Sequence, residues 1–433
     1  MTQVAERQDS YTAAFDAFRR DPAFGPAWLR ETREDAFARF AERGFPTTRD
    51  EEWLHTNIAP IASTPFARAG AAEPARKALE PFLYDGAIRT QIVVVNGRVS
   101  NALSQTSALP AGVTVTSLRE SLNAAGAQDL PLGALVSGAY PFAALNTALF
   151  EDAVVIRVAA RAVIDEPLHV LFVAAPGAEP TMASTRLLVV AESASQVKLV
   201  ESYAGVGSGA SFTNAVTEVS VADGAIVDHV KIQREQDSAF HVAGLFVRCE
   251  RSGVFSSQSL SLGGKIVRND VSTHLDGEGA ECTLNGLYLA GGDSLVDNHT
   301  LIDHAAPHCP SHEVYKGVLW GKARAVFNGK IIVRQIAQKT DAKQTNKALL
   351  LSDDAQINTK PQLEIFADDV KCTHGAAIGQ LDDDQLFYLQ ARGISRLDAR
   401  NMLVHAFAGD ILTRISIAPV RQRVEQIINA QLP

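Results

Sequence analysis

Several side chains that could bind a transition metal lie close together in the segment HTLIDHAAPHCPSH; they are His299, His304, His308, Cys309 and His312. Imidazole and thiolate are good ligands for zinc or iron. However, the spacing fits no site of known geometry, and Pro307 and Pro310 predict a turn. The segment alone therefore predicts a loop with surface or hydrogen-bonded histidines.

A second candidate is the segment DDVKCTHGAAIG, which contains Cys372 and His374. Two residues apart on a strand, their side chains would point to one face. One thiol and one imidazole cannot complete a four-coordinate site, but they form half of one if a partner chain supplies the rest. From the pattern alone, the simpler interpretation is that Cys372 is a small buried hydrophobic residue and His374 a hydrogen-bonded core histidine.

Other notable side chains have structural interpretations. Cys249 and Cys282 lie among apolar residues of expected strands and are predicted to be core residues. Trp53 and Trp320 are predicted to be packing anchors, because no basic groove accompanies them. The carboxylates of residues 382–384 suit a helix N-terminus, where the helix dipole favours negative charge.

Nucleotide-binding and nucleophile motifs are absent from the sequence. It contains no G-x-x-x-x-G-K-[ST], no G-x-G-x-x-G after a strand and no G-x-S-x-G. The segment Gly263-Gly264-Lys265-Ile266 has the wrong preceding spacing and lacks the Ser or Thr that holds Mg²⁺. We therefore expect that another subunit would supply any ATP-dependent step.

The elements that must position these residues fall into three regions. The first ~85 residues are predicted to be helical from the 3.6-residue spacing of their apolar residues. From about Thr90 to Gly379, short β-branched runs recur without a convincing helix, and Asn96-Gly97 predicts a hairpin turn. After Gly379, one-sided apolar stripes predict amphipathic helices, which could cap the preceding structure or bind a partner; one stripe comprises Ala399, Met402, Leu403, Ala406 and Phe407.

The strand region contains a loosely repeated unit of a turn residue followed by a strand. It begins at Gly224, Gly253, Gly279, Ala323 and Ala355; the first two steps are 29 and 26 residues and the last is 32. Such a repeat favours a stacked parallel coil, with long corner loops taking up the excess length of each step. The absence of helices excludes a doubly wound α/β fold.

Composition excludes several classes of partner. The chain has 433 residues and a net charge of −9, so we expect no nucleic-acid partner. The apolar stretches are much shorter than the roughly 20 residues of a membrane-spanning helix, and the N-terminus lacks the pattern of a secretory signal. Four cysteines without a C-x-x-C argue against a zinc ribbon. We expect a cytoplasmic protein without a membrane segment.

Three segments of the chain resemble the SufB/SufD family. They are FPTTRDEEWLHTNIAPI near the start, STRLLVVAESASQVKLVESYAG in the middle, and near the end ARAVFNGKIIV with KTDAKQTNKALLLSDDAQINTKPQLEIFADDVKCTHGAAIGQLDDDQLFYLQARGIS. The resemblance covers nearly the whole chain, and the helical N-terminal region and the length are more similar to SufD than to SufB. The C-x-x-C-x-x-x-C run of many SufB chains is absent, which argues that this chain is not the main cluster carrier.

The resemblance implies a mainly β fold: a right-handed parallel β-helix core over residues 86–380, flanked by α-helical domains over residues 1–85 and 381–433. It implies a non-catalytic scaffold subunit of the SufBCD complex, which assembles iron–sulfur clusters. Such a subunit pairs with a SufB-like paralogue through the ends of the β-helices and binds a SufC-like ATPase through its C-terminal helices.

The family's C-[ST]-H-G motif maps onto Cys372 and His374. The resemblance therefore implies that His374 is a metal ligand and that Cys372 lies beside it at a transient iron–sulfur cluster shared with the partner. It also implies that this chain binds no nucleotide. Two alternatives remain open: a homodimeric, off-pathway form of SufD, and a β-helix enzyme acting on polysaccharide with Asp276, Glu278 and Glu281 as acid and base carboxylates.

Overall fold

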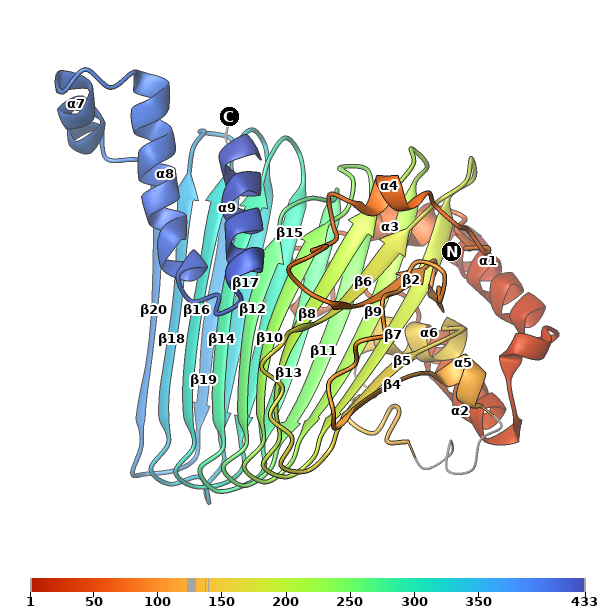
Figure 1. The fold of residues 1–433 in the computed structure, drawn as a ribbon. Helices are drawn as coiled ribbons and strands as arrows, with labels where there is room; N and C mark the ends of the chain where they lie inside the picture. Colours follow the sequence, from red (N-terminus) through yellow and green to blue (C-terminus); the bar gives the residue numbers. More distant parts are fainter. Residues whose placement is uncertain (1, 123–129, 137, 139, 432–433) are drawn as a thin grey trace.

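Two facing sheets form the core of the computed structural model, which describes residues 2–122, 130–136, 138 and 140–431 (Figure 1). Sheet A contains, in spatial order, β4 (Val113–Ser117), β5 (Val154–Val158), β7 (Thr181–Ala191), β9 (Ser211–Val221), β11 (Phe240–Cys249), β13 (Ile266–Leu275), β15 (Leu295–His304), β17 (Arg324–Val333) and β19 (Gln356–Ile365), with β1 (Ala67–Arg68) beside β7. Sheet B contains β3 (Arg98–Val99), β2 (Thr90–Val95), β6 (Leu168–Ala174), β8 (Gln196–Gly205), β10 (Ile226–Arg234), β12 (Val254–Ser261), β14 (Glu281–Ala290), β16 (Pro310–Leu319), β18 (Asp341–Leu350) and β20 (Lys371–Gly379).

From β5 onward the chain alternates between the two sheets, and neighbouring strands within each sheet are parallel. This arrangement is a parallel β-helix, as predicted. The antiparallel pairs β2–β3 and β4–β5 lie at its N-terminal end. Asn96 and Gly97 connect β2 to β3 with positive φ angles of 51° and 79°, which confirms the predicted hairpin turn.

The first three repeated sequence units precede β10, β12 and β14, which are successive strands of sheet B, and the last two precede β17 and β19 of sheet A. Ile226 pairs with Val254, and Val254 pairs with Glu281, so these coils advance by 28 and 27 residues. Each coil contains two strands of about ten residues. The long step therefore comes from long strands, and the expectation of long corner loops is wrong.

Side chains that point into the β-helix form one continuous apolar core. Its members include Leu187, Val219, Val247, Leu284 and Ile302. Some strands are buried on their outer face as well, because helices cover them. Every residue of β6 is buried, which explains its unbroken apolar sequence.

Most of the N-terminal region packs against the outer face of sheet A, whereas its last short helix packs against sheet B. Its helices are α1 (Thr2–Arg19), η1 (Pro22–Phe24), α2 (Ala27–Arg43), η2 (Glu51–Trp53), α3 (Ala59–Ser63) and α4 (Arg76–Leu79). Aromatic side chains such as Phe15, Phe40 and Trp53 form a cluster that includes Met182 and Phe212 of sheet A. Burying these rings attaches the helices to the strands.

Two helices interrupt the region that the sequence predicted to be free of them: α5 (Leu118–Ser121) and α6 (Pro141–Leu149). All residues of α6 are buried, between α2 and sheet A. A helix that is apolar on every side shows no 3.6-residue periodicity, which is why the pattern did not indicate it. Asn146 joins α6 to the sheet by donating hydrogen bonds to the carbonyls of Thr185 (2.9 Å) and Asn214 (2.8 Å).

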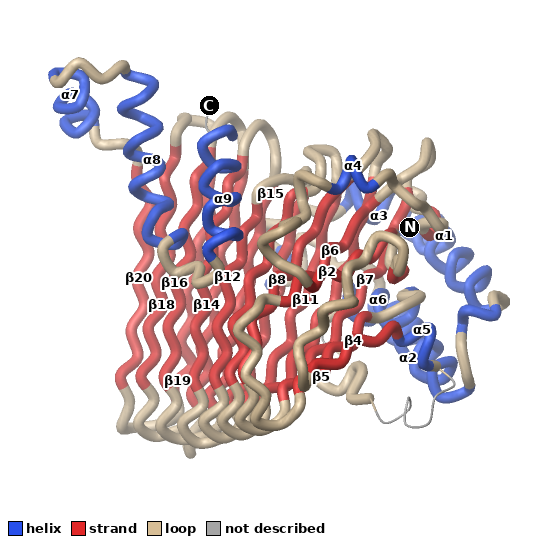
Figure 2. The backbone as a smooth tube through the Cα atoms, in the orientation of Figure 1, coloured by secondary structure: helices blue, strands red, loops and turns tan. Residues whose placement is uncertain are grey.

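The C-terminal helices are α7 (Asp383–Ala391), α8 (Arg396–Leu412) and α9 (Ala418–Gln431). Asp382 caps α7, as expected for a helix that starts at residues 382–384, and Ser395 caps α8; both side chains accept hydrogen bonds from backbone N–H groups. Apolar residues of α8 and α9, such as Val404 and Val424, pack on the outer face of sheet B. Figures 1 and 2 show α8 and α9 along the side of the β-helix, with its β20 end uncovered. The predicted domain boundaries at residues 85 and 380 stay predictions.

Candidate functional site

The strand β20 places Cys372 and His374 at the open end of the β-helix. Only β18 pairs with β20, with Cys372 beside Ala342 and His374 beside Gln344. Cys372 is half-buried and packs near Ile331 inside the last coil. His374, two residues further along the strand, follows the same face and is exposed. The simpler interpretation of His374 as a core histidine is therefore wrong.

A buried polar pair lies directly below His374 inside the β-helix. Glu313, Gln344 and His374 occupy one row across β16, β18 and β20. The amide Nε2 of Gln344 donates a hydrogen bond to Oε2 of Glu313 at 2.7 Å. Burial raises the pKa of Glu313 to about 7, and hydrogen bonding only partly offsets this effect. Sequence reasoning missed both residues, although Glu313 is a lone carboxyl at an inward position of an alternating strand.

The remaining thiols are structural. Cys249, Cys282 and Cys309 are buried, as expected for the first two. Burial raises the pKa of each thiol, to about 12 for Cys282. Burial likewise raises the pKa of Cys372, which is the least enclosed of the four. A thiol with a raised pKa is a poor nucleophile, so a metal that binds Cys372 must displace its proton.

The predicted histidine cluster is dispersed. His304 points into the β-helix and lies 3.0 Å from the Ser311 hydroxyl, whereas His308 is exposed in a corner with φ of 60°. His312 is exposed on β16, and His299 faces outward from β15. The predicted turn is thus confined to the corner between these two strands. In the described part of the chain, no three His, Cys, Asp or Glu side chains could hold a metal ion.

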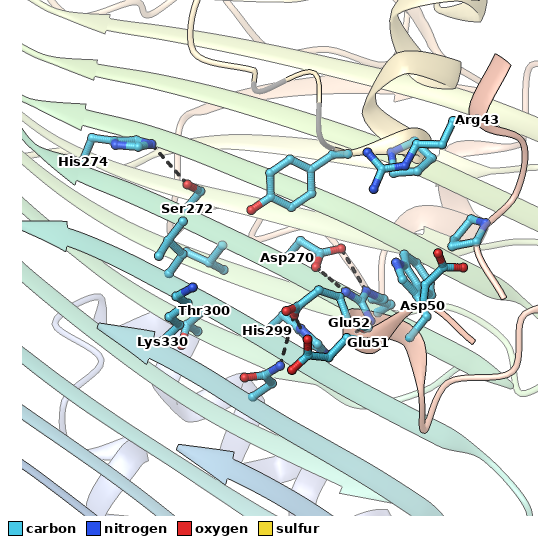
Figure 3. Close-up of a pocket in the computed structure, with 18 residues that line it drawn as sticks. Arg43, Asp50, Glu51, Glu52, Asp270, Ser272, His274, His299, Thr300 and Lys330 are labelled. Atoms are coloured by element: carbon cyan, nitrogen blue, oxygen red, sulfur yellow. Dashed lines mark hydrogen bonds and ion pairs between the residues drawn. The ribbon is translucent and has the colours of Figure 1, made fainter. Parts of the chain in front are cut away.

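A cavity of about 510 Å³ lies where the N-terminal region meets sheet A (Figure 3). Its walls come from η2 and from the outward faces of β13, β15 and β17. Glu52 lies within hydrogen-bonding distance of His299 Nδ1 (3.2 Å) and Asn328 Nδ2 (3.1 Å). Arg268 donates to the Glu52 carbonyl (2.8 Å) and lies 3.7 Å from the ring centre of Trp53. Trp53 is thus a packing anchor, as predicted.

Buried charges strengthen this attachment of the N-terminal region. The carboxylate of Asp297 accepts hydrogen bonds from Arg268 (2.6 Å) and from Thr56 (2.5 Å). Burial disfavours a charged imidazole at His299, but the Asp297 carboxylate outweighs burial and raises the pKa of His299 to about 9. The hydrogen bond from His299 in turn lowers the pKa of Glu52. This wall of the cavity is therefore a network of ion pairs that joins distant parts of the chain. We call it the clamp; its members are Glu52, Arg268, Asp297 and His299.

A series of Ser272, His274 and Asp303 lies at the other side of the cavity (Figure 3 shows the first two). His274 Nε2 is 3.4 Å from the serine hydroxyl and its Nδ1 is 3.3 Å from Asp303. Both distances exceed those of an activated nucleophile. Asp303 also accepts two hydrogen bonds from Arg334, at 2.9 and 2.7 Å. The series is therefore a structural set of contacts in which Asp303 pairs with His274 and Arg334.

The carboxylates considered for polysaccharide chemistry belong to a solvated corner. Asp276 and Glu278 are exposed, and Asp276 pairs with Arg248 at 2.9 Å. A side chain at Gly277 would collide with the backbone of Arg251 in the preceding coil, so the glycine spacing serves coil stacking. Glu281 begins the next strand with an exposed side chain. None of the three carboxylates lines the 510 Å³ cavity.

An apolar surface covers part of α7 and α8. Phe387 is 72% exposed, Tyr388 57%, Leu397 56% and Met402 50%. Met402 belongs to the apolar stripe for which the sequence left open a capping or a partner-binding role, and the buried face of α8 includes Val404. Exposed apolar patches of this kind mark interaction surfaces. None of the helices in the described ranges has the length and apolar character needed to cross a lipid bilayer.

Comparison with known proteins gives matches along almost the entire chain. A family model described as the SufBD core domain of SUF system FeS cluster assembly matches residues 172–407. A second, for the SufBD protein N-terminal region, matches residues 6–170. An iron–sulfur cluster assembly SufBD family protein of Synechocystis sp. is 34% identical, covering 89% of this chain and 87% of the relative. The iron–sulfur cluster assembly protein SufD of Escherichia coli is 31% identical, covering 90% of each.

Proposed function

The chain belongs to the SufBD family of iron–sulfur cluster assembly proteins, and from this premise we propose that it is a non-catalytic scaffold subunit of a SufBCD-type complex. It pairs with a SufB-like paralogue and binds a SufC-like ATPase. The nascent cluster is its cargo. The observation that carries the proposal is the uncovered strand β20, which presents Cys372 and His374 at the end of the β-helix.

The open end has the properties of a pairing surface. Nearly all residues of β20 are exposed, although strands in the middle of the same sheet are almost fully buried. Apolar side chains lie exposed around this end, including Ile365, Phe366 and Ile378. An edge strand offers unpaired backbone N–H and C=O groups, and a partner strand can extend the sheet by pairing with them. Natural proteins protect such edges unless they use them.

The ligand chemistry suits a cluster shared between two chains. Cys372 and His374 supply one thiolate and one imidazole on the same face, which is half of a four-coordinate iron site. Strand pairing at β20 would bring the ligands of the partner to this face. The cluster would then form only within the heterocomplex, and its loss or transfer would follow when the two ends separate.

The exposed apolar surface of α7 and α8 supports the ATPase contact. It lies on helices beside sheet B, away from the N-terminal region (Figure 2). ATP-driven movement of the ATPase subunits could thus reach the open end through α8, which packs directly on β14 and β16. Such coupling requires an element with two discrete arrangements.

The test is coexpression with the SufB-like and SufC-like partners, followed by purification and measurement of iron and sulfide content. His374→Ala should leave the complex intact and lower its cluster content at least several-fold. The matched control is His312→Ala, because His312 is exposed on the same sheet but faces away from the open end. An intact His374→Ala complex with undiminished cluster content would remove His374 from the site.

A second candidate is a homodimer that uses the same exposed edge, since β20 would pair with a second copy as readily as with a paralogue. Size measurements over a range of concentrations, with and without the SufB-like partner, separate the two. Homodimers that persist at equimolar partner would favour this off-pathway form.

A further inference from the structure

The side chain of Gln344 has an unusual position one rung below His374. It is 2% exposed, extends across the interior from sheet B, and reaches the backbone of Gly329 on β17. A Cβ atom at position 329 would lie only 2.7 Å from Cδ of Gln344, so the absence of a side chain there makes room for the amide. The last coil therefore has a glycine at position 329, with no side chain to pack in the interior, where the amide of Gln344 lies.

The two ends of the Gln344 amide differ in their partners. Nε2 donates to Glu313 Oε2 at 2.7 Å, whereas Oε1 is buried and has no hydrogen-bond donor among the described residues. The nearest amide of the same strand, Asn346, is already committed, because its Nδ2 donates to Thr359 at 3.0 Å. A buried carbonyl oxygen without a donor is costly, and such groups usually have a function.

The next side chain along the same row is His374. Paired residues of neighbouring strands lie about 4.8 Å apart, and their side chains follow the same direction. Rotation of the exposed imidazole about its side-chain bonds could direct a ring N–H group toward Oε1 of Gln344. Above pH 7 Glu313 is mainly ionised and can only accept hydrogen bonds, so it holds Nε2 of the amide toward itself and leaves Oε1 for the imidazole.

We propose that Gln344, held by Glu313, is a positioning residue for His374: its Oε1 accepts a hydrogen bond from the N–H of one ring nitrogen and thereby leaves the other nitrogen free for iron. This inference rests on the proposed function only in naming iron as the incoming ion. Metal-binding histidines commonly donate their second N–H to a carbonyl or carboxylate, which fixes both tautomer and ring orientation. Here the carbonyl is that of the Gln344 side chain, and Glu313 on the preceding coil orients this side chain.

The primary test measures the tautomer of His374 in the metal-free, full-length chain. The protein is labelled with ¹⁵N-histidine, and the His374 signals are assigned by their loss in His374→Ala. A single dominant tautomer is expected in the wild type. In Gln344→Met the two tautomers should average as in a solvated imidazole. Lys347→Met is the matched control, since Lys347 is exposed on the same strand. A wild-type ring with averaged tautomers, or one unchanged in Gln344→Met, would overturn the proposal.

Glu313→Gln provides a second variant that keeps the shape of the buried row. A glutamine at 313 can donate or accept, so the amide of Gln344 loses its single orientation, and the tautomers of His374 should again mix. This variant decides the matter if Gln344→Met fails to fold. Retention of one tautomer in Glu313→Gln would contradict the role given to Glu313.

Measurement of Fe²⁺ binding in the assembled complex separates this inference from the proposed function. In the assembled complex, Gln344→Met should weaken binding of Fe²⁺ by about 10- to 100-fold, as loss of a ligand's hydrogen-bond partner commonly does. If His374→Ala leaves iron binding unchanged, the proposed function fails. The tautomer measurement, which uses the metal-free chain, then still tests whether Gln344 orients His374. If His374→Ala abolishes binding and Gln344→Met has no effect, the positioning role is wrong.

Discussion

His374 and Glu313 occupy one row of the β-helix but opposite environments. The imidazole is exposed at the open end, whereas the carboxyl lies two strands deeper and is 2% exposed. Burial penalises the charged form of Glu313, which is why its pKa rises to about 7. The row therefore joins a solvent-accessible imidazole to a buried carboxyl that prefers its neutral form below pH 7.

Glu313→Gln should stabilise the fold at alkaline pH. The folded pKa of about 7 lies above the ordinary value of 4.5, so the wild type loses stability between pH 4.5 and 7 as the buried carboxyl ionises, and does not recover it above pH 7. We expect Glu313→Gln to melt at a higher temperature than the wild type at pH 8. The free energy of unfolding should rise by on the order of 2–3 kcal/mol. The gain should shrink at pH 5. A gain independent of pH would contradict this explanation.

The sequence predicted some site residues and concealed others. Cys372 and His374 were recognisable because their spacing and motif are local. Glu313 was not, because whether a residue on a strand points inward depends on register, which an isolated carboxyl does not reveal. The clamp at His299 was also hidden, since its partner Glu52 is 247 residues away in the chain.

At the scale of elements, β20 differs from the other long strands of sheet B in having a neighbour on only one side. Its sequence, KCTHGAAIG, is short of charges that would discourage pairing with another chain. The strand is thus suited to binding and would be an aggregation risk in isolation.

Ile378→Lys should abolish copurification of the SufB-like partner, because a charge at the exposed edge would have to be desolvated on pairing. Ile378 is 47% exposed. Ile226→Lys is the matched control: Ile226 is 37% exposed but lies on β10, between two paired strands. Equal loss of the partner in both variants would point to general destabilisation.

Phe387→Ser should reduce binding of the SufC-like ATPase while the chain still folds, since the ring is 72% exposed in α7. We expect at least a tenfold weaker interaction, as for an anchor residue in an interface. Leu54→Ser, at a residue 56% exposed in the N-terminal region, is the control. Unchanged ATPase binding by Phe387→Ser would place the contact elsewhere.

Helices were predicted correctly from the sequence where one face of the helix is exposed to solvent. Caps at Asp382 and Ser395 and the buried stripe of α9 were readable, because polar and apolar residues alternate with the period of the helix. The helix α6 was missed because it is buried on every side. In α8 both faces are apolar, so the sequence could not distinguish the face that packs on sheet B from the exposed face that contains Met402.

At the scale of the whole molecule, most of the N-terminal region packs on the outer face of sheet A and the C-terminal helices pack on that of sheet B, which leaves the β20 end uncovered. The N-terminal attachment depends on the charged clamp around Glu52 and His299. Since its members lie on η2, β13 and β15, the clamp joins the start of the chain to the middle of the core.

His299→Gln should weaken this attachment at neutral and mildly acid pH, but not at alkaline pH. The folded pKa of about 9 exceeds the ordinary value of 6.5, so the charged imidazole contributes stability that is complete below pH 6.5 and is lost as pH rises through 9. The wild type should be more stable than His299→Gln at pH 7, by on the order of 1–3 kcal/mol, and the difference should vanish near pH 10. His312→Gln, at an exposed position, should match the wild type at both pH values. A difference that persists at pH 10 would show that the charge is not its cause.

The central claim is that the open end of this β-helix donates an imidazole to a cluster completed by a partner. The most direct measurement is pulsed electron paramagnetic resonance of the reduced cluster in the heterocomplex, with only this chain labelled with ¹⁵N-histidine. We predict a ¹⁵N coupling typical of directly bound imidazole, which disappears in His374→Ala. A cluster without such coupling, or one whose coupling survives that substitution, would contradict the account.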